Sequence, residues 1–383
     1  MELYMHVPFC RQKCRYCDFA SWAGREAWMP AYVTAMLQEA AHARKALGPQ
    51  PISTVFLGGG TPSVLPAEEL RRLLRGVMEQ FPLEPGAEFT SEANPGTLTE
   101  AWLDTAVSLG VNRLSLGMQA AQAPLLRTLG RIHTLEQVRE AVDLARQAGV
   151  KNLSLDLMFG LPGQTLADWA ETLEAALDLA PEHLSCYGLI PEEGTPLGEA
   201  IHRGEVTLPS EEEERAMYDM ALQRLHQAGF MQYEISNFAR PGYACAHNLG
   251  YWRQVPYLGL GVGAASMLPG RQSGEAYRRR TNVRDLASYL RQGETGNFAP
   301  AEAESITPAE ACFETMMLGL RTREGVSERA FMAMHGISLE QMYGQRLTAL
   351  ASRGLMEKHG EWWRLTRRGM DVQNAVLVEL MEE

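Results

Sequence analysis

Three cysteines near the start of the chain have a spacing suited to binding an iron–sulfur cluster. Cys10, Cys14 and Cys17 form a C-x3-C-x2-C pattern, which can place three thiolates around one small inorganic cluster. A [4Fe-4S] cube held by three cysteines keeps one iron without a protein ligand. That iron can bind a substrate or cofactor, as a catalytic zinc site does at its open position. The pattern therefore predicts a [4Fe-4S] cluster with one reactive iron.

Structural zinc is the alternative for these cysteines. Such sites usually have four ligands, often in two close pairs, whereas Cys186, Cys245 and Cys312 lie far along the chain and far from one another. His6 is a candidate fourth ligand, but it falls within an expected strand over residues 3–7. The spacing therefore favours the cluster over zinc.

Composition and charge exclude several classes of protein. The formal charge is 35 − 47 = −12, so no basic surplus exists to neutralise the phosphates of a nucleic acid. Six cysteines in 383 residues are too few for a disulfide framework, which indicates a reducing compartment. Nine residues before the first cysteine cannot hold a signal peptide, and the apolar stretch 257–268 is short and contains three glycines. We expect a cytoplasmic protein that is neither a nucleic-acid binder nor an integral membrane protein.

Apolar strands alternate with amphipathic helices over the first 230 residues. The expected strands are 3–7, 52–57, 88–92, 113–119, 152–158 and 183–187. Helices are expected between them, three with capping-box patterns at Thr97/Glu100, Thr134/Gln137 and Thr165/Asp168, and the last over 211–228. This alternation predicts parallel βα units and the α/β class. Six units instead of eight predict a partial, laterally open (β/α)6 barrel of the TIM type.

Polar and glycine residues recur where these strands end. The three cysteines, residues 58–61, Glu92, Gln119 and Asp156 all fall at strand exits. The exits of parallel strands share one rim of a barrel, and chemistry gathers there. The sequence therefore predicts a pocket at this rim.

Residues 1–230 resemble the radical S-adenosylmethionine (SAM) core of the coproporphyrinogen-III-dehydrogenase-like family. The resemblance implies that the open iron holds the amino and carboxylate groups of SAM and that the cluster cleaves SAM to a 5′-deoxyadenosyl radical. It also implies SAM-site roles for Tyr4, Tyr16, Gly59, Gly60, Thr61, Glu92, Gln119, Arg131 and Asp156. These residue types suit the ligand, because glycine admits close backbone approach, carboxylates accept hydrogen bonds and arginine pairs with a carboxylate.

The segment 245–252 contains the string H-N-x-x-Y-W, which is similar to a signature of the HemW-type heme chaperones, a branch of the same family. The resemblance implies that His247, Tyr251 and Trp252 contact heme. Histidine is a usual axial ligand of heme iron, and the two aromatic rings offer apolar faces to a porphyrin. A packed turn with a hydrogen-bonded histidine is the alternative interpretation.

The remaining chain divides into two further parts. Residues 231–306 are expected to connect the core to a C-terminal domain over 307–383, where helices precede a small hairpin. This order predicts a mostly helical, winged-helix-like domain, similar to the C-terminal domain of the family. The glycines of 259–263 superficially match a dinucleotide fingerprint, but no βαβ unit surrounds them, so we interpret them as close backbone packing.

Three functions compete within this resemblance. The first is a heme chaperone that passes heme to apo-hemoproteins, with membrane-associated acceptors among the candidates. The second is an oxygen-independent coproporphyrinogen III dehydrogenase, and the third is another heme-modifying radical SAM enzyme. The decarboxylase has a fourth cysteine two positions beyond the third, where this chain has Phe19, and a substantial extension before the cluster. The sequence therefore favours the chaperone without coproporphyrinogen III dehydrogenase activity, while the retained SAM residues leave SAM turnover open.

Overall fold

A twelve-stranded sheet forms the frame of the molecule. The computed structural model describes residues 1–381. The strands of the large sheet lie in the order β14-β13-β12-β11-β1-β4-β5-β6-β7-β8-β10-β9. Six of them form a parallel series: β1 (Glu2–Val7), β4 (Ile52–Gly59), β5 (Leu83–Ala93), β6 (Arg113–Gln119), β7 (Asn152–Phe159) and β8 (His183–Gly188). Each contains an expected strand, so the predicted partial α/β barrel is confirmed.

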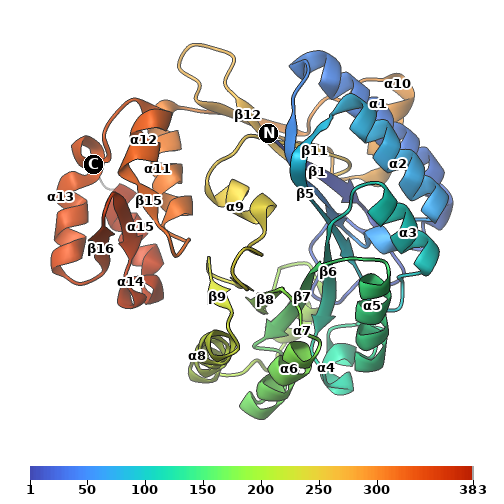
Figure 1. Cartoon of the computed structure of the whole chain (residues 1–383), viewed down its shortest axis with the longest axis horizontal. Helices are drawn as coiled ribbons and strands as arrows, with labels where there is room; N and C mark the ends of the chain where they lie inside the picture. The colour runs from blue at the N-terminus through green and yellow to red at the C-terminus, as the bar shows by residue number, and fades with distance from the viewer. Residues whose placement is uncertain (382–383) are drawn as a thin grey trace.

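Helices connect these strands, and the longer ones cover the outside of the curved sheet (Figure 1). The helices are α1 (Met29–Leu47), α2 (Ala67–Gln80), α3 (Glu100–Ser108), α4 (Ala123–Thr128), α5 (Leu135–Gln147), α6 (Leu166–Asp178), α7 (Pro196–His202) and α8 (Glu211–Gln227). The short α4 and α7 share a separate apolar cluster with Tyr16 of the cysteine loop. Thr134 and Thr165 form the expected capping boxes with the side chains three residues later. The third expected box is wrong, because Thr99 caps α3 while the Thr97 hydroxyl donates to the Asn94 carbonyl at 2.6 Å.

The segment 231–306 extends the sheet at both edges. At one edge, β9 (Met231–Gln232) and β10 (Asn237–Ala239) pair antiparallel beside β8. At the other, β11 (Tyr257–Leu260) pairs parallel with β1 and leads into β12 (Ala265–Pro269), β13 (Tyr277–Thr281) and β14 (Glu302–Ile306). The helices of this segment are α9 (Ala246–Trp252) and α10 (Leu286–Thr295). A side chain at Gly259 would overlap the Ala265 carbonyl, so close backbone packing requires this glycine.

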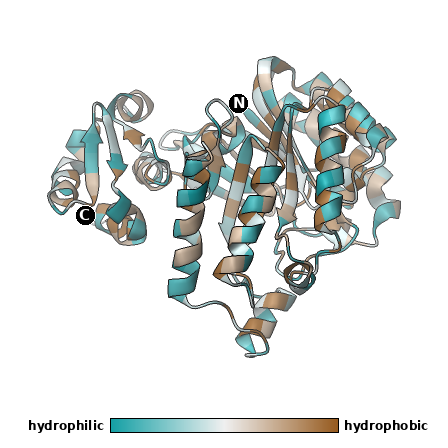
Figure 2. Cartoon of the chain, turned by 60° about the horizontal axis from the view of Figure 1, so that its bottom comes forward, coloured by the Kyte–Doolittle hydropathy of each residue, from teal (hydrophilic) through white to brown (hydrophobic). Residues whose placement is uncertain are grey.

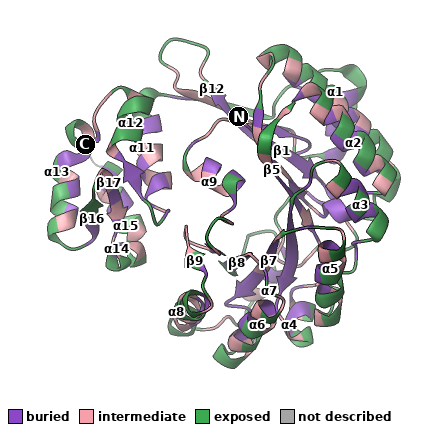
Figure 3. Cartoon of the chain, in the orientation of Figure 1, coloured by how far each residue is buried: buried purple, intermediate pink, exposed green. Residues whose placement is uncertain are grey.

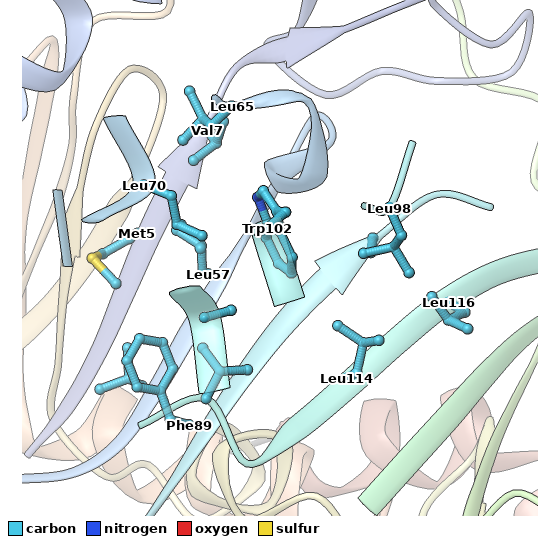
Figure 4. Packing of buried hydrophobic residues seen from close by; sticks show 14 of the residues in the cluster. Met5, Val7, Leu57, Leu65, Leu70, Phe89, Leu98, Trp102, Leu114 and Leu116 are labelled. Carbon is cyan, nitrogen blue, oxygen red and sulfur yellow. The ribbon is translucent and has the colours of Figure 1, made fainter. Parts of the chain in front are cut away.

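The main core lies between the sheet and its outer helices. Figure 4 shows Trp102 of α3 and Leu70 of α2 against strand residues such as Leu57 and Phe89. The helices turn apolar faces to the sheet and polar faces to solvent (Figure 2), and burial follows the same division (Figure 3). Apolar burial therefore fixes which way each strand faces and leaves the strand ends to carry polar groups.

The C-terminal residues form a unit with a core of its own. It comprises α11 (Pro308–Gly319), β15 (Val326–Ser327), α12 (Glu328–His335), α13 (Leu339–Ser352), β16 (Met356–His359), β17 (Trp362–Leu365), α14 (Arg367–Asp371) and α15 (Gln373–Met381). The small sheet has the order β15-β17-β16, and the helix–strand sequence is that of a winged helix. Its buried cluster, from Cys312 to Leu380, is separate from the barrel core.

Short elements complete the described chain: β2 (Phe9–Cys10), β3 (Trp22–Ala23), and the 3-10 turns η1 (Glu26–Trp28) and η2 (Pro62–Val64). Between residues 1 and 381, no helix combines the length and apolar character needed to cross a bilayer.

Candidate functional site

The three cysteines of the motif lie on one half-buried loop at the carboxyl end of β1. All three carry free thiols. Two of their sulfurs already have donors: Thr61 Oγ1 donates to Cys10 Sγ and Arg131 Nη1 donates to Cys14 Sγ, each at 3.5 Å. Donors to sulfur are among the features that tune an iron–sulfur cluster.

Asn94 connects these two donors, and the sequence analysis did not single it out. Its Nδ2 donates to Thr61 Oγ1 at 2.9 Å, while Arg131 Nη2 donates to its Oδ1 at 2.7 Å. One amide thus links the group beside Cys10 to the group beside Cys14. Its place in the turn directly after a strand that ends at the rim was the available signal.

The loop fits a cluster better than a single metal ion. Within residues 1–381, no three His, Cys, Asp or Glu side chains converge closely enough to hold one ion. His6 is not available as a fourth ligand, because Tyr4 Oη lies 2.9 Å from its Nδ1 and the Ala20 carbonyl 2.9 Å from its Nε2. Burial raises the pKa of the Cys10 and Cys17 thiols, which therefore need a cationic partner to exist as thiolates.

Two half-buried carboxylates face the barrel interior close to this loop. Glu92 Oε2 accepts from the Gly59 amide at 3.1 Å, and Asp156 accepts from Ser115 Oγ at 3.1 and 3.2 Å. Burial, with the Asp156 charge second, raises the pKa of Glu92 to about 8, and burial also raises that of Asp156. Two carboxylates that repel each other in this way form an acceptor pair suited to a cationic ligand.

Gln119 has a strained backbone at the exit of β6. Its φ is +65°, and the pairing of β6 with β7 shifts register between Gly117 and this residue. A non-glycine residue in this region costs about 1–3 kcal/mol, and such strain concentrates at functional sites. A Cβ at Gly117 would lie 2.8 Å from both Gln119 Nε2 and Arg131 Nη2, so that glycine gives both side chains room.

The remaining predicted SAM residues surround the same rim. Gly60 has no room for a side chain, since a Cβ would lie 2.8 Å from the Phe9 carbonyl beside the cysteine loop. Burial raises the pKa of Tyr16, so its phenol is neutral beside Arg131. Tyr4 lies deeper in the barrel, stacked on Phe56 with ring centroids 6.3 Å apart. The roles of these residues toward SAM stay predictions.

His247 lies at the opposite end of the barrel, buried on α9. Thr54 Oγ1 is 2.8 Å from its Nδ1 and Tyr251 Oη is 2.9 Å from its Nε2, so both ring nitrogens are hydrogen-bonded. Only 1% of the residue is exposed, and burial, assisted by Arg113, lowers its pKa to about 3. In this conformation the imidazole is neutral, and neither nitrogen is free for an iron ion.

The rest of α9 is fixed against the amino ends of the strands. The Glu88 carboxylate accepts from the amides of Ala246 and His247, at 3.0 and 3.1 Å, and so caps the helix. A side chain at Gly250 would overlap the Glu2 carboxylate, which shows how closely α9 lies on β1. Along β4, Thr54 and Gly59 are five residues apart, roughly 16 Å at the rise of a strand. The heme-signature histidine and the cysteine loop therefore lie at opposite ends of the barrel.

Glu92 makes the stability of the cluster-free protein depend on pH. Its pKa is about 8 in the folded state against 4.5 when unperturbed, so between these values folding takes up a proton and the free energy of unfolding falls as pH rises. Glu92→Gln should remove that dependence, at most about 1.4 kcal/mol per pH unit. In urea unfolding, the free energy of unfolding of the variant relative to that of native protein should be higher at pH 7.5 than at pH 5.5. Exposed Glu136→Gln is the control, and equal behaviour of the two variants would contradict the assignment.

Comparisons with known proteins agree with this architecture. The family model described as "Radical SAM superfamily" matches residues 4–176, and the model "HemN C-terminal domain" matches residues 306–372. The solved structure of the coproporphyrinogen III oxidase HemN from Escherichia coli superposes with a TM-score of 0.84 over 99% of this chain and 89% of that chain. At 23% identity this likeness shows the fold alone.

Curated relatives give the family. "Heme chaperone HemW" of Synechocystis is 39% identical over 94% of this chain and 86% of its own length. The proteins of the same name from Bacillus subtilis and Escherichia coli are 36% and 33% identical over 99% and 100% of this chain, and over 99% and 98% of their own lengths. The radical SAM match implies a [4Fe-4S] cluster and SAM as cofactors. The chain belongs to the HemW family of heme chaperones, built on a radical SAM scaffold with a HemN-type C-terminal domain.

Proposed function

We propose that this protein binds heme and passes it to apo-hemoproteins, on a scaffold that binds a [4Fe-4S] cluster and SAM. The observation that carries the proposal is similarity along the whole chain to proteins named heme chaperones. The string His247–Trp252 supports it, because it forms a distinct helix, α9, that the barrel holds in place through specific contacts. Six free cysteines agree with a reducing, cytoplasmic site of action.

The rim residues would hold the cluster and SAM. Cys10, Cys14 and Cys17 would be the cluster ligands, with Thr61 and Arg131 donating to two of the sulfurs. When bound, the cluster and SAM supply one-electron chemistry. Around them, glycines at positions 59 and 60 admit close backbone approach, and Glu92 and Asp156 offer acceptors. Tyr16 and Gln119 would line the same end of the barrel, with Tyr4 deeper inside and its hydroxyl beside His6.

The decarboxylase alternative receives no support from the cysteine loop. Phe19 stands where that enzyme has a fourth cysteine, and this side chain is 63% exposed. A phenyl ring supplies neither a ligand nor a proton. We therefore propose that the protein has no coproporphyrinogen III dehydrogenase activity.

We also propose that the chain divides into three parts. They are a radical SAM core over 1–230, a connecting segment over 231–306 that extends the sheet, and a C-terminal domain over 307–383.

Heme contact by α9 is proposed with a distinction among its three predicted residues. Trp252 lies on the wall of a cavity between the barrel and the C-terminal domain, whereas His247 and Tyr251 are hydrogen-bonded to each other at the base of the barrel. Axial ligation by His247 stays a prediction, and it would require its bonds to Thr54 and Tyr251 to break. Breaking them without replacement costs on the order of 1–3 kcal/mol for each group left unpaired.

Asn94→Ala should weaken cluster retention, because it removes the amide that links Thr61 to Arg131. After anaerobic reconstitution, the variant should lose iron to a chelator several-fold faster than native protein, while a triple Cys10/Cys14/Cys17→Ala variant should bind no cluster. Asn94→Asp keeps the acceptor for Arg131 but loses the donor to Thr61, so it should restore only part of the retention.

The matched control is Asn112→Ala, which removes two hydrogen bonds of another turn asparagine, those to the Phe89 amide and the Ala87 carbonyl. Both alanine variants should lose about 1–3 kcal/mol of unfolding free energy in the cluster-free state. If Asn112→Ala released iron as fast as Asn94→Ala, the effect would be one of general stability, and the proposed role of Asn94 would fail.

Native protein should bind heme and should not convert coproporphyrinogen III. Heme titration followed in the Soret band should saturate. Cluster-loaded protein with SAM and reductant should yield no protoporphyrinogen by chromatography. Turnover of coproporphyrinogen III would overturn the chaperone proposal in favour of the decarboxylase. In the same titration, axial ligation by His247 predicts a displaced Soret maximum in His247→Ala, and an unchanged maximum removes this residue from the iron.

A further inference from the structure

A cavity of about 930 Å³ lies between the open edge of the barrel and the C-terminal domain. Its walls come from α8, β9 and β10 on the barrel side, from α9, and from α11, α12 and β17 of the C-terminal domain. Figure 1 shows α9 between the two parts of the molecule. The volume falls in the range of cavities that enclose a large organic ligand.

The cavity wall is mostly apolar and carries unusually exposed side chains. Trp252 and Trp362 are half-buried and supply aromatic surface, whereas Phe230 and Phe331 lie behind the wall in the two hydrophobic cores. Met231 and Met334 line the same space with 63% and 43% of their surfaces exposed. Large apolar side chains left exposed in a concave site mark a surface that a ligand covers.

Positive charge borders this apolar space although the whole chain carries −12. Four arginines line the cavity against one carboxylate, Glu324, which already pairs with Arg253 at 2.9 Å. Arg364 pairs with a glutamate outside the cavity. Arg240 and Arg323 have no carboxylate within ion-pairing distance among residues 1–381. The Nε of Arg240 donates to the Pro181 carbonyl at 3.4 Å, and its guanidinium lies 4.7 Å from the centre of the Phe230 ring. Two guanidinium groups that have no carboxylate partner, beside an apolar space, suit a flat ligand with two carboxylates.

We propose that this interdomain cavity is the heme site, with Arg240 and Arg323 binding the two propionates. The inference rests on the proposed function and assigns its location. Trp252 and the apolar wall would cover the porphyrin. His226, Met231 and Met334 on the wall carry atoms that ligate heme iron. Ligands drawn from exposed side chains of two domains suit a protein that must release its heme.

The proposal also explains how α9 uses its two faces. Leu249, Trp252 and Arg253, at spacings of three and four, face the cavity. His247 and Tyr251, four residues apart, face the barrel and bond to each other. His247 is then a positioning residue that fixes α9 on β4, while Trp252 meets the ligand.

The test compares hemin with its dimethyl ester, which lacks the carboxylates. Arg240→Ala/Arg323→Ala should weaken hemin binding about tenfold or more and leave ester binding unchanged. Arg139→Ala/Arg203→Ala, at two exposed arginines far from the cavity, is the matched control and should bind hemin as native protein does. Ala330→Trp, which fills the cavity from α12, should weaken both ligands, with near-ultraviolet circular dichroism verifying the fold.

The outcomes separate the site from the function. If native protein failed to bind hemin, the proposed function itself would fail. If native protein bound hemin and the arginine and Ala330→Trp variants bound it equally well, the cavity would be the wrong site. His226→Phe/Met231→Leu/Met334→Leu should displace the Soret maximum and His247→Ala should not. The reverse pattern would place the iron at the barrel end of α9.

Discussion

The parallel pairing of β1 with both β4 and β11 is the constraint from which the two ends of the barrel follow. Its carboxyl end delivers the cysteine loop, and its amino end places Glu2 under Gly250 of α9. Because parallel strands all run the same way, each neighbour adds one group to the rim and one to the base. Thus β4 contributes Gly59 to the rim and Thr54 to the base. The site around the cysteine loop and the site that anchors α9 are therefore built from opposite ends of the same strands. The length of the strands keeps the two sites apart.

Polar groups at the two ends serve different purposes. At the base, the hydrogen-bonding needs of Thr54, Glu88 and His247 are met by one another or by α9. Glu2 is the exception there, because burial raises its pKa to about 8 and its Oε2 has no hydrogen-bond partner among residues 1–381. At the rim, Glu92 and Asp156 retain exposed surface, and burial opposes their charge. A carboxylate with a raised pKa destabilises the folded chain above neutrality, and where such a group is also accessible, as at the rim, it is a candidate for ligand contact. The two ends therefore differ in access, since the rim carboxylates are half-buried whereas Glu2 and His247 at the base are 2% and 1% exposed.

Much of this arrangement was predictable from the sequence, and the exceptions have a common physical cause. The periodicity of apolar residues predicted the strands and helices of all six βα units. The cysteine spacing and the polar residues at strand ends predicted where the rim lies. Asn94 was missed because its importance comes from Thr61 and Arg131, which only the sheet brings together. The pair His247 and Tyr251 has helical spacing, but the sequence does not say which face of α9 meets the barrel. The edge strands β9 to β14 were missed because short strands at sheet edges carry a weak periodic signal.

The fold itself does not distinguish a heme chaperone from an enzyme that makes a heme precursor. HemN from Escherichia coli shares almost the whole architecture at 23% identity, so the difference must lie in side chains placed on a common frame. In this chain Phe19 is an exposed phenyl ring beside the cysteine loop, and Arg240 and Arg323 place positive charge beside an apolar interdomain cavity. The rim and the cavity lie on different parts of the frame, connected by the barrel and α9. The cavity wall shares no residue with the cysteine loop or with Glu92, Gln119, Arg131 and Asp156 of the rim, so substitutions at one place need not alter the other.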